Sequence, residues 1–355
     1  MTSACPPSLT DKSAAPAAPA APAVEAEAPK QDNWSADAYQ KSASFVPQLA
    51  TKAVALLSPA PHDRILDLGA GDGPLTAQIG AQCAYILGLD ASPAMIAAAK
   101  LAHEIPGRCE FRVADCRFLA REMGVLLPLE TETAETEGDA GAASAGATAG
   151  AGAAGDSDSD GKATQAPHSE EAYDKIFSNA ALHWILRSPP TRAALFDTIH
   201  ALLKPNGVFA FELGGAGNIA EVHAALVSAL IHHGVPAARA RAASPWFFPS
   251  ETWMRAALIR AGFGDVQLET EYRPTRLPEA EAEGAGLEGW VRLMGAEFLA
   301  LVEGERARDG VVAFVLEALK GVVGRPEDGG GEGGEWLGYV RLRGRATKAA
   351  AGASS

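Results

Sequence analysis

The chain has 355 residues and a formal net charge of −14, and 47% of its residues are hydrophobic. This length can bury one large core, or a core with a small accessory lobe, and no run of about 18 apolar residues predicts a membrane span. The acidic balance argues against nucleic acid as a partner, because phosphates bind a basic face. The four cysteines are too irregularly spaced for a disulfide framework or a metal site.

Three segments have compositions that cannot build a core. Residues 1–31 are rich in Ala and Pro and lack the order of a secretory signal, so we expect a cytoplasmic protein. Residues 131–170 consist largely of Gly, Ala, Ser and acidic side chains. These two segments and the tail 349–355 bury too little apolar area to offset the entropy of ordering, and we predict them to be disordered. The remaining residues, 32–348, are predicted to form one domain around the acidic insertion.

Short apolar runs alternate with helical patterns along this domain. Helices are predicted over Leu75–Gln82, Pro93–Ala102 and Thr191–Leu203. Strands are predicted over Arg64–Leu68, Tyr85–Asp90, Glu110–Ala114, Lys175–Ser178, Val208–Phe211, Val266–Thr270 and Tyr339–Arg343. Strands separated by single helices indicate a parallel sheet with right-handed crossovers, which is an α/β fold.

A glycine-rich turn follows the first strand directly, with Gly69, Gly71 and Gly73 after Asp67. Glycines allow a sharp turn and close approach of a ligand, and nucleotide-type ligands bind at the carboxyl ends of parallel strands. A dinucleotide site is the competing interpretation, but the third glycine comes one residue early for that pattern. Asp67 would also repel a pyrophosphate, whereas it would attract a ligand that carries ammonium and sulfonium groups.

Two further aspartates end the next two strands. Asp90 ends the second strand about 21 residues after Gly69, where an acid can accept hydrogen bonds from both ribose hydroxyls. Asp115 ends the third strand, where it can accept from an adenine amino group. Without the glycine turn, Asp90 would be interpreted as a helix cap or a turn residue.

Together these segments resemble the class I S-adenosylmethionine-dependent methyltransferases. The segments Tyr173–Trp184 and Leu202–Gly207 follow in the family's order. Within this family, the chain looks most like the trans-aconitate and malonyl-carrier carboxyl methyltransferase branch. Three segments carry that likeness: the sequence Asn-Ala-Ala-Leu-His-Trp from Asn179, Trp34–Tyr39 and Trp246–Ser250. The resemblance covers about residues 33–125 and 172–275; the acidic insertion and residues 276–335 depart from it.

The resemblance implies a Rossmann-like, doubly wound, mostly parallel seven-stranded sheet with an antiparallel last strand. A small helical C-terminal lid or insert, residues 218–335, would lie on the substrate side. S-adenosylmethionine would be the cofactor, bound by residues that follow the strands and by one residue of a lid helix. Tyr39 could instead only pack that helix down. The implied cofactor-binding residues are Tyr39, Asp67, Gly69, Ala70, Gly71, Asp90, Ala91, Asp115, Cys116 and Asn179.

His183 is the candidate catalytic residue, four positions after Asn179. It could orient a carboxylate acceptor, act as a general base for a hydroxyl or carbon acceptor, or simply be hydrogen-bonded within its loop. Trp246, Phe247, Phe248 and Trp253 could cap an acceptor cavity or only hold the C-terminal helices to the sheet. A carboxylate would need a cation, for which the sequence offers Arg187, Arg273, Arg276 and Arg292 without ranking them.

The expected function is therefore methyl transfer to a small-molecule acceptor, with a carboxylate oxygen favoured. Alternatives are a C- or O-methyltransferase of a quinone, sterol or polyketide-type metabolite, and a non-catalytic S-adenosylmethionine-binding scaffold. A nicotinamide oxidoreductase is disfavoured by the spacing of the glycines. We expect no metal, no nucleic acid and no membrane as partners.

Overall fold

The computed structural model describes residues 50–127, 172–278, 286–325 and 334–350. The tracts 1–31 and 131–170, Tyr39 and residues 351–355 lie outside these ranges. The strands are β1 (Arg64–Leu68), β2 (Tyr85–Asp90), β3 (Cys109–Val113), β4 (Tyr173–Asn179), β5 (Leu203–Gly214), β6 (Phe263–Arg276), β7 (Gly324–Arg325) and β8 (Gly334–Lys348).

One sheet organises the described residues, in the order β3-β2-β1-β4-β5-β8-β6, with the two-residue β7 paired to β8 outside this path. Neighbouring strands from β3 to β5 are parallel. The last strand, β8, lies between β5 and β6 and is antiparallel to both. The predicted Rossmann-like sheet with an antiparallel last strand is confirmed.

Helices cover both faces of the sheet. One face carries α3 (Thr51–Leu57), α4 (Pro74–Gly80) and α5 (Pro93–His103) over a core that includes Ile65, Ile79 and Phe177. The other face carries α6 (Leu119–Met123), the short α7 (Leu182–Ile185), α8 (Pro189–Leu202) and α11 (Glu251–Arg260). A 3-10 turn, η1 (Cys116–Phe118), precedes α6. Because residues of a strand alternate between faces, even-numbered residues of β5 such as Ala210 and Glu212 face the α3 side.

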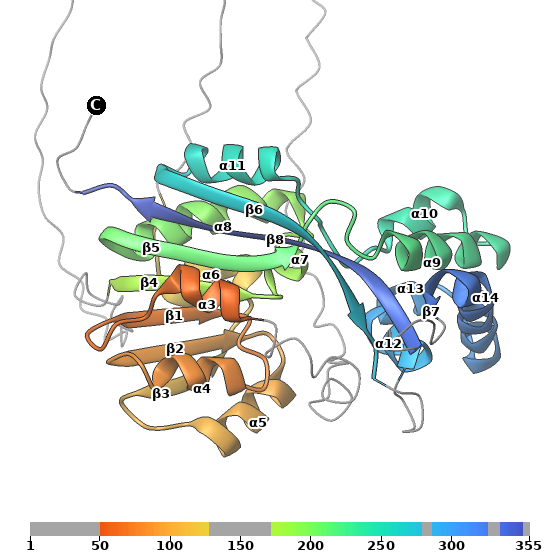
Figure 1. The fold of residues 1–355 in the computed structure, drawn as a ribbon, viewed down its shortest axis with the longest axis horizontal. Coiled ribbons are helices and arrows are strands. Elements are labelled where there is room, and N and C mark those ends of the chain that lie inside the picture. Colours follow the sequence, from red (N-terminus) through yellow and green to blue (C-terminus); the bar gives the residue numbers. More distant parts are fainter. Residues whose placement is uncertain (1–49, 128–171, 279–285, 326–333, 351–355) are drawn as a thin grey trace, which may run out of the picture. The chain divides into compact units, whose positions relative to one another are not determined.

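The remaining helices form a cluster with its own core. They are α9 (Ala220–His232), α10 (Ala237–Ala242), α12 (Gly286–Met294), α13 (Ala296–Leu299) and α14 (Glu305–Val323). Trp290 and Phe298 are fully buried in this core, which also takes Leu337 from β8. In Figure 1, β6 and β8 extend beyond the parallel strands and lead into this helical cluster. The helices therefore lie at the end of the sheet where β4 and β5 terminate.

Candidate functional site

The glycine turn after β1 has a backbone that only glycine adopts without strain. Gly69, Gly71 and Gly73 have φ values of 84°, 58° and 91°. A Cβ atom added at Gly69 would lie 2.1 Å from the Cβ of Ala181, which follows β4. The N–H groups of Gly69 and Ala70 donate to the carbonyl of Leu89 at 2.7 and 2.9 Å. The turn is thus fixed against β2 and the segment after β4. Of the three glycines, Gly71 has the most space, since the nearest atom to an added Cβ, Cε of Met95, lies 3.9 Å away.

Asp90, at the end of β2, is oriented by this turn. Its Oδ2 accepts from the N–H of Gly71 at 3.0 Å, and its Oδ1 accepts from the N–H of Ser92 at 2.9 Å. Each carboxylate oxygen has two lone-pair sites, so hydroxyl donors can still be accepted. Ala91 beside it is exposed.

Asp67 is buried below the turn. Its Oδ2 accepts from the hydroxyl of Thr76 on α4 at 2.6 Å. Burial raises the pKa of Asp67 to about 7, against the opposing effect of the Thr76 hydrogen bond, and the charge of Asp90 adds to the rise. A cation near this carboxyl would favour its ionised form.

Asp115 and Cys116 follow β3. Asp115 forms an ion pair with Arg117 at 2.7 Å and accepts from the Arg117 N–H at 3.0 Å. Burial alone would raise the pKa of Asp115, but the hydrogen bonds and charge of Arg117 outweigh it, so this pKa is lowered. The Cys116 thiol is buried, and burial together with the charge of Asp90 raises its pKa. Arg117 is a neighbour of the expected adenine acceptor that the sequence analysis did not consider.

Asn179 ends β4 and pairs in register with Glu212 of β5. Its Oδ1 is buried and accepts no hydrogen bond from the described residues. An unsatisfied buried amide oxygen costs about 1–3 kcal/mol, which a donor on a bound ligand would recover. The following residue, Ala180, has a φ of 56°, unusual for a residue with a side chain.

His183 lies on α7, against the end of β5. Its Nδ1 accepts from the N–H of Gly214 at 3.3 Å. Burial and, secondarily, the charge of Arg341 lower the pKa of His183 well below its usual value. The imidazole is therefore neutral, and because Nδ1 accepts, its proton is on Nε2. Nε2 makes no hydrogen bond to any residue that the structure describes.

The four aromatic candidates divide between two places. Trp246 and Phe248 stack with ring centroids 5.9 Å apart, and Phe248 lies 5.7 Å from the ring of His183. Phe247 and Trp253 instead pack in the core between the sheet, α8 and α11, where the guanidinium of Arg192 lies 3.6 Å from the Phe247 ring centroid. Trp246 and Phe248 thus border the His183 site, whereas the other two residues hold α11 to the sheet.

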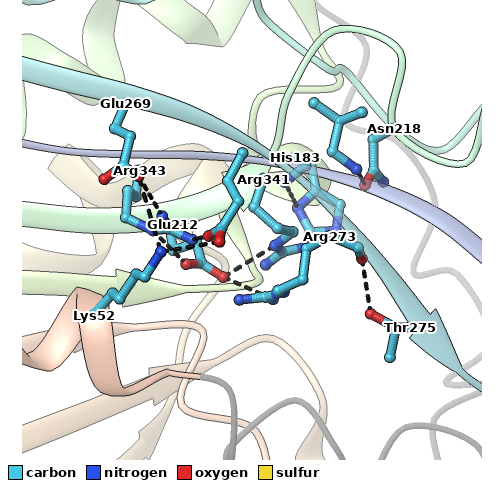
Figure 2. Close-up of polar contacts among 12 residues, drawn as sticks. Lys52, His183, Glu212, Asn218, Glu269, Arg273, Thr275, Arg341 and Arg343 are labelled. Carbon is cyan, nitrogen blue, oxygen red and sulfur yellow. Dashed lines mark hydrogen bonds and ion pairs between the residues drawn. The ribbon is translucent and has the colours of Figure 1, made fainter.

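The arginine candidates also separate. Arg187 is paired with Glu297, and Arg292 with Glu288 and Asp309, while Arg276 lies beside Gly334. Arg273 instead joins a buried cluster around Glu212 together with Arg341 and Arg343 of β8 (Figure 2). The sequence analysis missed Glu212 and Arg341. The available signal was the alternation of arginine with small or apolar residues along β8, which places the arginines on one face.

Comparisons with known proteins agree with this arrangement. A family model described as a methyltransferase domain matches residues 42–268. An uncharacterised methyltransferase of Schizosaccharomyces pombe is 34% identical over 250 residues, which are 70% of this chain and 76% of the relative. The chain belongs to the class I S-adenosylmethionine-dependent methyltransferases.

The other comparisons with this methyltransferase are more distant. Trans-aconitate 2-methyltransferase of Escherichia coli is 28% identical over 174 residues, 48% of this chain and 47% of that enzyme. The chain thus matches about half of the length of that relative. The crystal structure of YcgJ from Bacillus subtilis has a TM-score of 0.48 at 12% identity and covers 86% of this chain and 99% of its own, a likeness of fold alone.

The methyltransferase uses S-adenosylmethionine, and its residues fit that group. The turn offers a glycine backbone, Asp90 has acceptor capacity, and the Oδ1 of Asn179 lacks a donor among the described residues. Within the described ranges, no group of three or more His, Cys, Asp or Glu side chains could hold a metal ion. Of the helices that the structure describes, none combines the length and apolar character needed to cross a bilayer.

Proposed function

We propose that this methyltransferase transfers the methyl group to a carboxylate oxygen of a small-molecule acceptor. The observation that carries the proposal is the hydrogen bond from the Gly214 N–H to Nδ1 of the buried His183, which leaves Nε2 as the nitrogen that can donate; the lowered pKa of His183 favours the same neutral form. The partial likeness to the E. coli trans-aconitate 2-methyltransferase supports the same acceptor class. We also propose that the enzyme acts in the cytoplasm.

The proposed roles of the cofactor-binding residues follow their positions. Gly69, Ala70 and Gly71 would line the methionine half of the cofactor, with the Asp67 carboxyl beneath its ammonium group. Asp90, with Ala91 beside it, would accept from the ribose hydroxyls. Asp115 and Cys116 would border the adenine, and Asn179 would accept a hydrogen bond beside the sulfonium. Tyr39, which lies outside the described residues, would also contact the cofactor.

S-adenosylmethionine supplies, when bound, a methyl group already activated by its sulfonium. The residues of the chain then have to hold the acceptor in line and exclude water. A carboxylate attacks as it is, without loss of a proton, so no general base is required. The Nε2–H of His183 can donate to one carboxylate oxygen and leave the other oxygen directed at the methyl group.

A second candidate is methylation of a hydroxyl or carbon of a flat, apolar metabolite. This candidate is favoured by the aromatic rings near His183, which would pack against a flat, apolar acceptor. They belong to Trp184, Trp246 and Phe248. This chemistry needs a base to remove a proton. His183 could serve only after breaking the Gly214 hydrogen bond or changing its tautomer, which makes this candidate the weaker one.

The test is an assay of S-adenosylhomocysteine release across small carboxylic acids, quinones and phenols. At saturating S-adenosylmethionine, which removes the effect of Asp67 on cofactor affinity, we expect release with a carboxylic acid at a rate nearly independent of pH between about 6 and 9, because no reacting group titrates there. His183→Gln, which keeps a donor near the Nε2 position, should retain more activity than His183→Ala. Release only with phenols or quinones, rising with pH, would contradict the carboxylate proposal.

A further inference from the structure

A buried carboxylate in the methyltransferase is surrounded by three guanidinium groups. The Oε1 of Glu212 accepts from Arg273 Nη2 at 3.1 Å and from Arg341 Nε at 3.0 Å. Its Oε2 accepts from Arg343 Nε at 2.9 Å. Figure 2 shows these side chains converging on Glu212 from β6 and β8. Glu212 and Arg343 are each 1% exposed and Arg341 is 5% exposed, so these charges are removed from bulk water.

The negative charge in this cluster is not shared evenly. Arg343 donates to Oε2 of Glu212 and to Glu271, and it forms an ion pair with Glu269 at 3.2 Å. Lys52 of α3 also pairs with Glu271, at 2.9 Å. Arg341, in contrast, donates only to Oε1 of Glu212 among the described residues, and Arg273 donates to the same oxygen. Arg341, at the end of the cluster nearer His183, therefore has only a share of one carboxylate oxygen.

Arg341 has donors to spare at this end. A guanidinium carries five N–H donors, and only Nε of Arg341 donates to a residue that the structure describes. Burying a charged group without its hydrogen bonds is costly, so an acceptor at the terminal nitrogens would stabilise it. The planar fork of a guanidinium matches a carboxylate in two parallel hydrogen bonds.

The position of Arg341 connects it to the proposed acceptor site. On β8 it lies directly opposite Gly214 of β5, whose N–H holds Nδ1 of His183. Side chains of Phe248 and Asn218 occupy the space where a Cβ atom of Gly214 would lie, and the charge of Arg341 contributes to lowering the pKa of His183. In Figure 2, Arg341 and Arg273 lie on the His183 and Asn218 side of Glu212, while Glu269 and Lys52 lie on the other.

We propose that Arg341 binds an anionic carboxylate group of the acceptor, and that Glu212 is the positioning residue that fixes its guanidinium. The inference rests on the proposed function, since it identifies what would hold a carboxylic acid acceptor at His183. An enzyme with this site would select its acceptor by negative charge, so it would not bind a neutral analogue of the same shape.

The probe is sodium malonate, a small carboxylate, with malonamide as its neutral counterpart, added to the full chain in the presence of S-adenosylhomocysteine. At about 20 mM malonate we expect the melting temperature to rise by about 2–4 °C, because a ligand that binds only the folded state stabilises it. Malonamide should give no rise. Absence of a malonate effect in the unaltered protein would overturn the proposal.

Each variant is compared with and without malonate, so that its own stability does not enter the result. Arg341→Gln should abolish the malonate-induced rise. If it does not fold, Arg341→Lys serves instead, because it keeps the charge without the fork and should bind malonate about tenfold more weakly by calorimetry. The matched control is Arg260→Gln, whose arginine pairs with Asp197 at 3.1 Å between α11 and α8. An undiminished response in the Arg341 variants would contradict the anion site.

The two proposals fail in different ways. A malonate response that depends on Arg341, combined with no methylation of any carboxylic acid, would leave the anion site standing and overturn the proposed acceptor. Methylation of a carboxylic acid with an unchanged KM in Arg341→Lys would keep the proposed function and overturn the anion site. The expected result is a KM raised about tenfold in that variant with a smaller change in kcat.

Discussion

At the scale of single residues, the glycine turn makes the sharpest prediction. Gly69 and Gly107 both have positive φ values, 84° and 75°, but only Gly69 has a neighbour where a side chain would lie. Gly107→Ala should cost about 1–2 kcal/mol of stability from its backbone alone. Gly69→Ala should cost more, because its Cβ would overlap Ala181 and displace the turn.

Calorimetric titration with S-adenosylhomocysteine separates these two variants. The Gly69→Ala variant should bind the cofactor about tenfold or more weakly, because its turn is displaced. This loss corresponds to at least about 1.4 kcal/mol of binding free energy. Gly107→Ala should bind the cofactor as the unaltered protein does. Equal affinities in all three proteins would mean that the contact with Ala181 does not shape the cofactor site.

Asp90 gives a second prediction at this scale. Asp90→Ala should lose about 1.5–3 kcal/mol of cofactor binding free energy, because charged acceptors for the ribose hydroxyls disappear. The Gly71 and Ser92 N–H groups also lose their acceptor, so part of the loss comes from the turn. Asp174→Asn is the control, since that acid pairs with Lys204 at 2.9 Å at the start of β4. Unchanged affinity in Asp90→Ala by calorimetry would remove Asp90 from the cofactor site.

The roles of residues that belong to a local sequence pattern could be predicted from the sequence. The roles of residues whose partners are distant in the sequence could not. The positive φ values after β1 belong to three glycines within five positions of one another. Ser92 caps α5 by accepting from the N–H of Met95, three residues later. Glu212 and Arg341, however, meet across 129 positions. No local periodicity specifies such a pair, because it depends on which strands are neighbours in the sheet.

At the scale of elements, the insertion of β8 between β5 and β6 depends on how its arginines are neutralised. Glu212→Gln should destabilise the protein by about 3–5 kcal/mol, because three buried guanidiniums would lose their shared carboxylate. Glu269→Gln is the matched control. It contacts the same Arg343, but its side chain is 59% exposed, so its loss should cost about 1 kcal/mol or less. Urea unfolding of the three proteins measures the difference, and similar midpoints would argue against a stabilising role for Glu212.

The boundaries of the elements show the same division between local and distant causes. β1 and β2 begin and end where predicted, because their apolar runs are bounded by a turn and an acid. The late strands were predicted over Val266–Thr270 and Tyr339–Arg343, but they span Phe263–Arg276 and Gly334–Lys348. Many of their additional residues are glycine, polar or charged, and the strands extend because β6 and β8 pair with each other along their length. Cross-strand partners satisfy side chains that look like loop residues in the sequence.

At the scale of the whole molecule, the methyltransferase domain is interrupted between α6 and β4, where the acidic tract is inserted. The described residues on either side are held by contacts of their own. Leu119 of α6 is buried against the core under α8, and β4 lies between β1 and β5 with both pairings formed. The free energy of folding should therefore depend little on what joins them, since loop length enters only logarithmically.

Deleting 131–167 should accordingly change the melting temperature by no more than about 2 °C and leave cofactor affinity unchanged. A length-matched variant, in which the acidic residues of the tract are replaced by serine, separates length from charge. If both variants match the unaltered protein, the tract is dispensable for the fold, as its Gly, Ala and acidic composition predicts. A large fall in the deletion alone would mean that the segment contributes contacts to the domain. A fall in both would mean that the negative charge of the tract stabilises the domain.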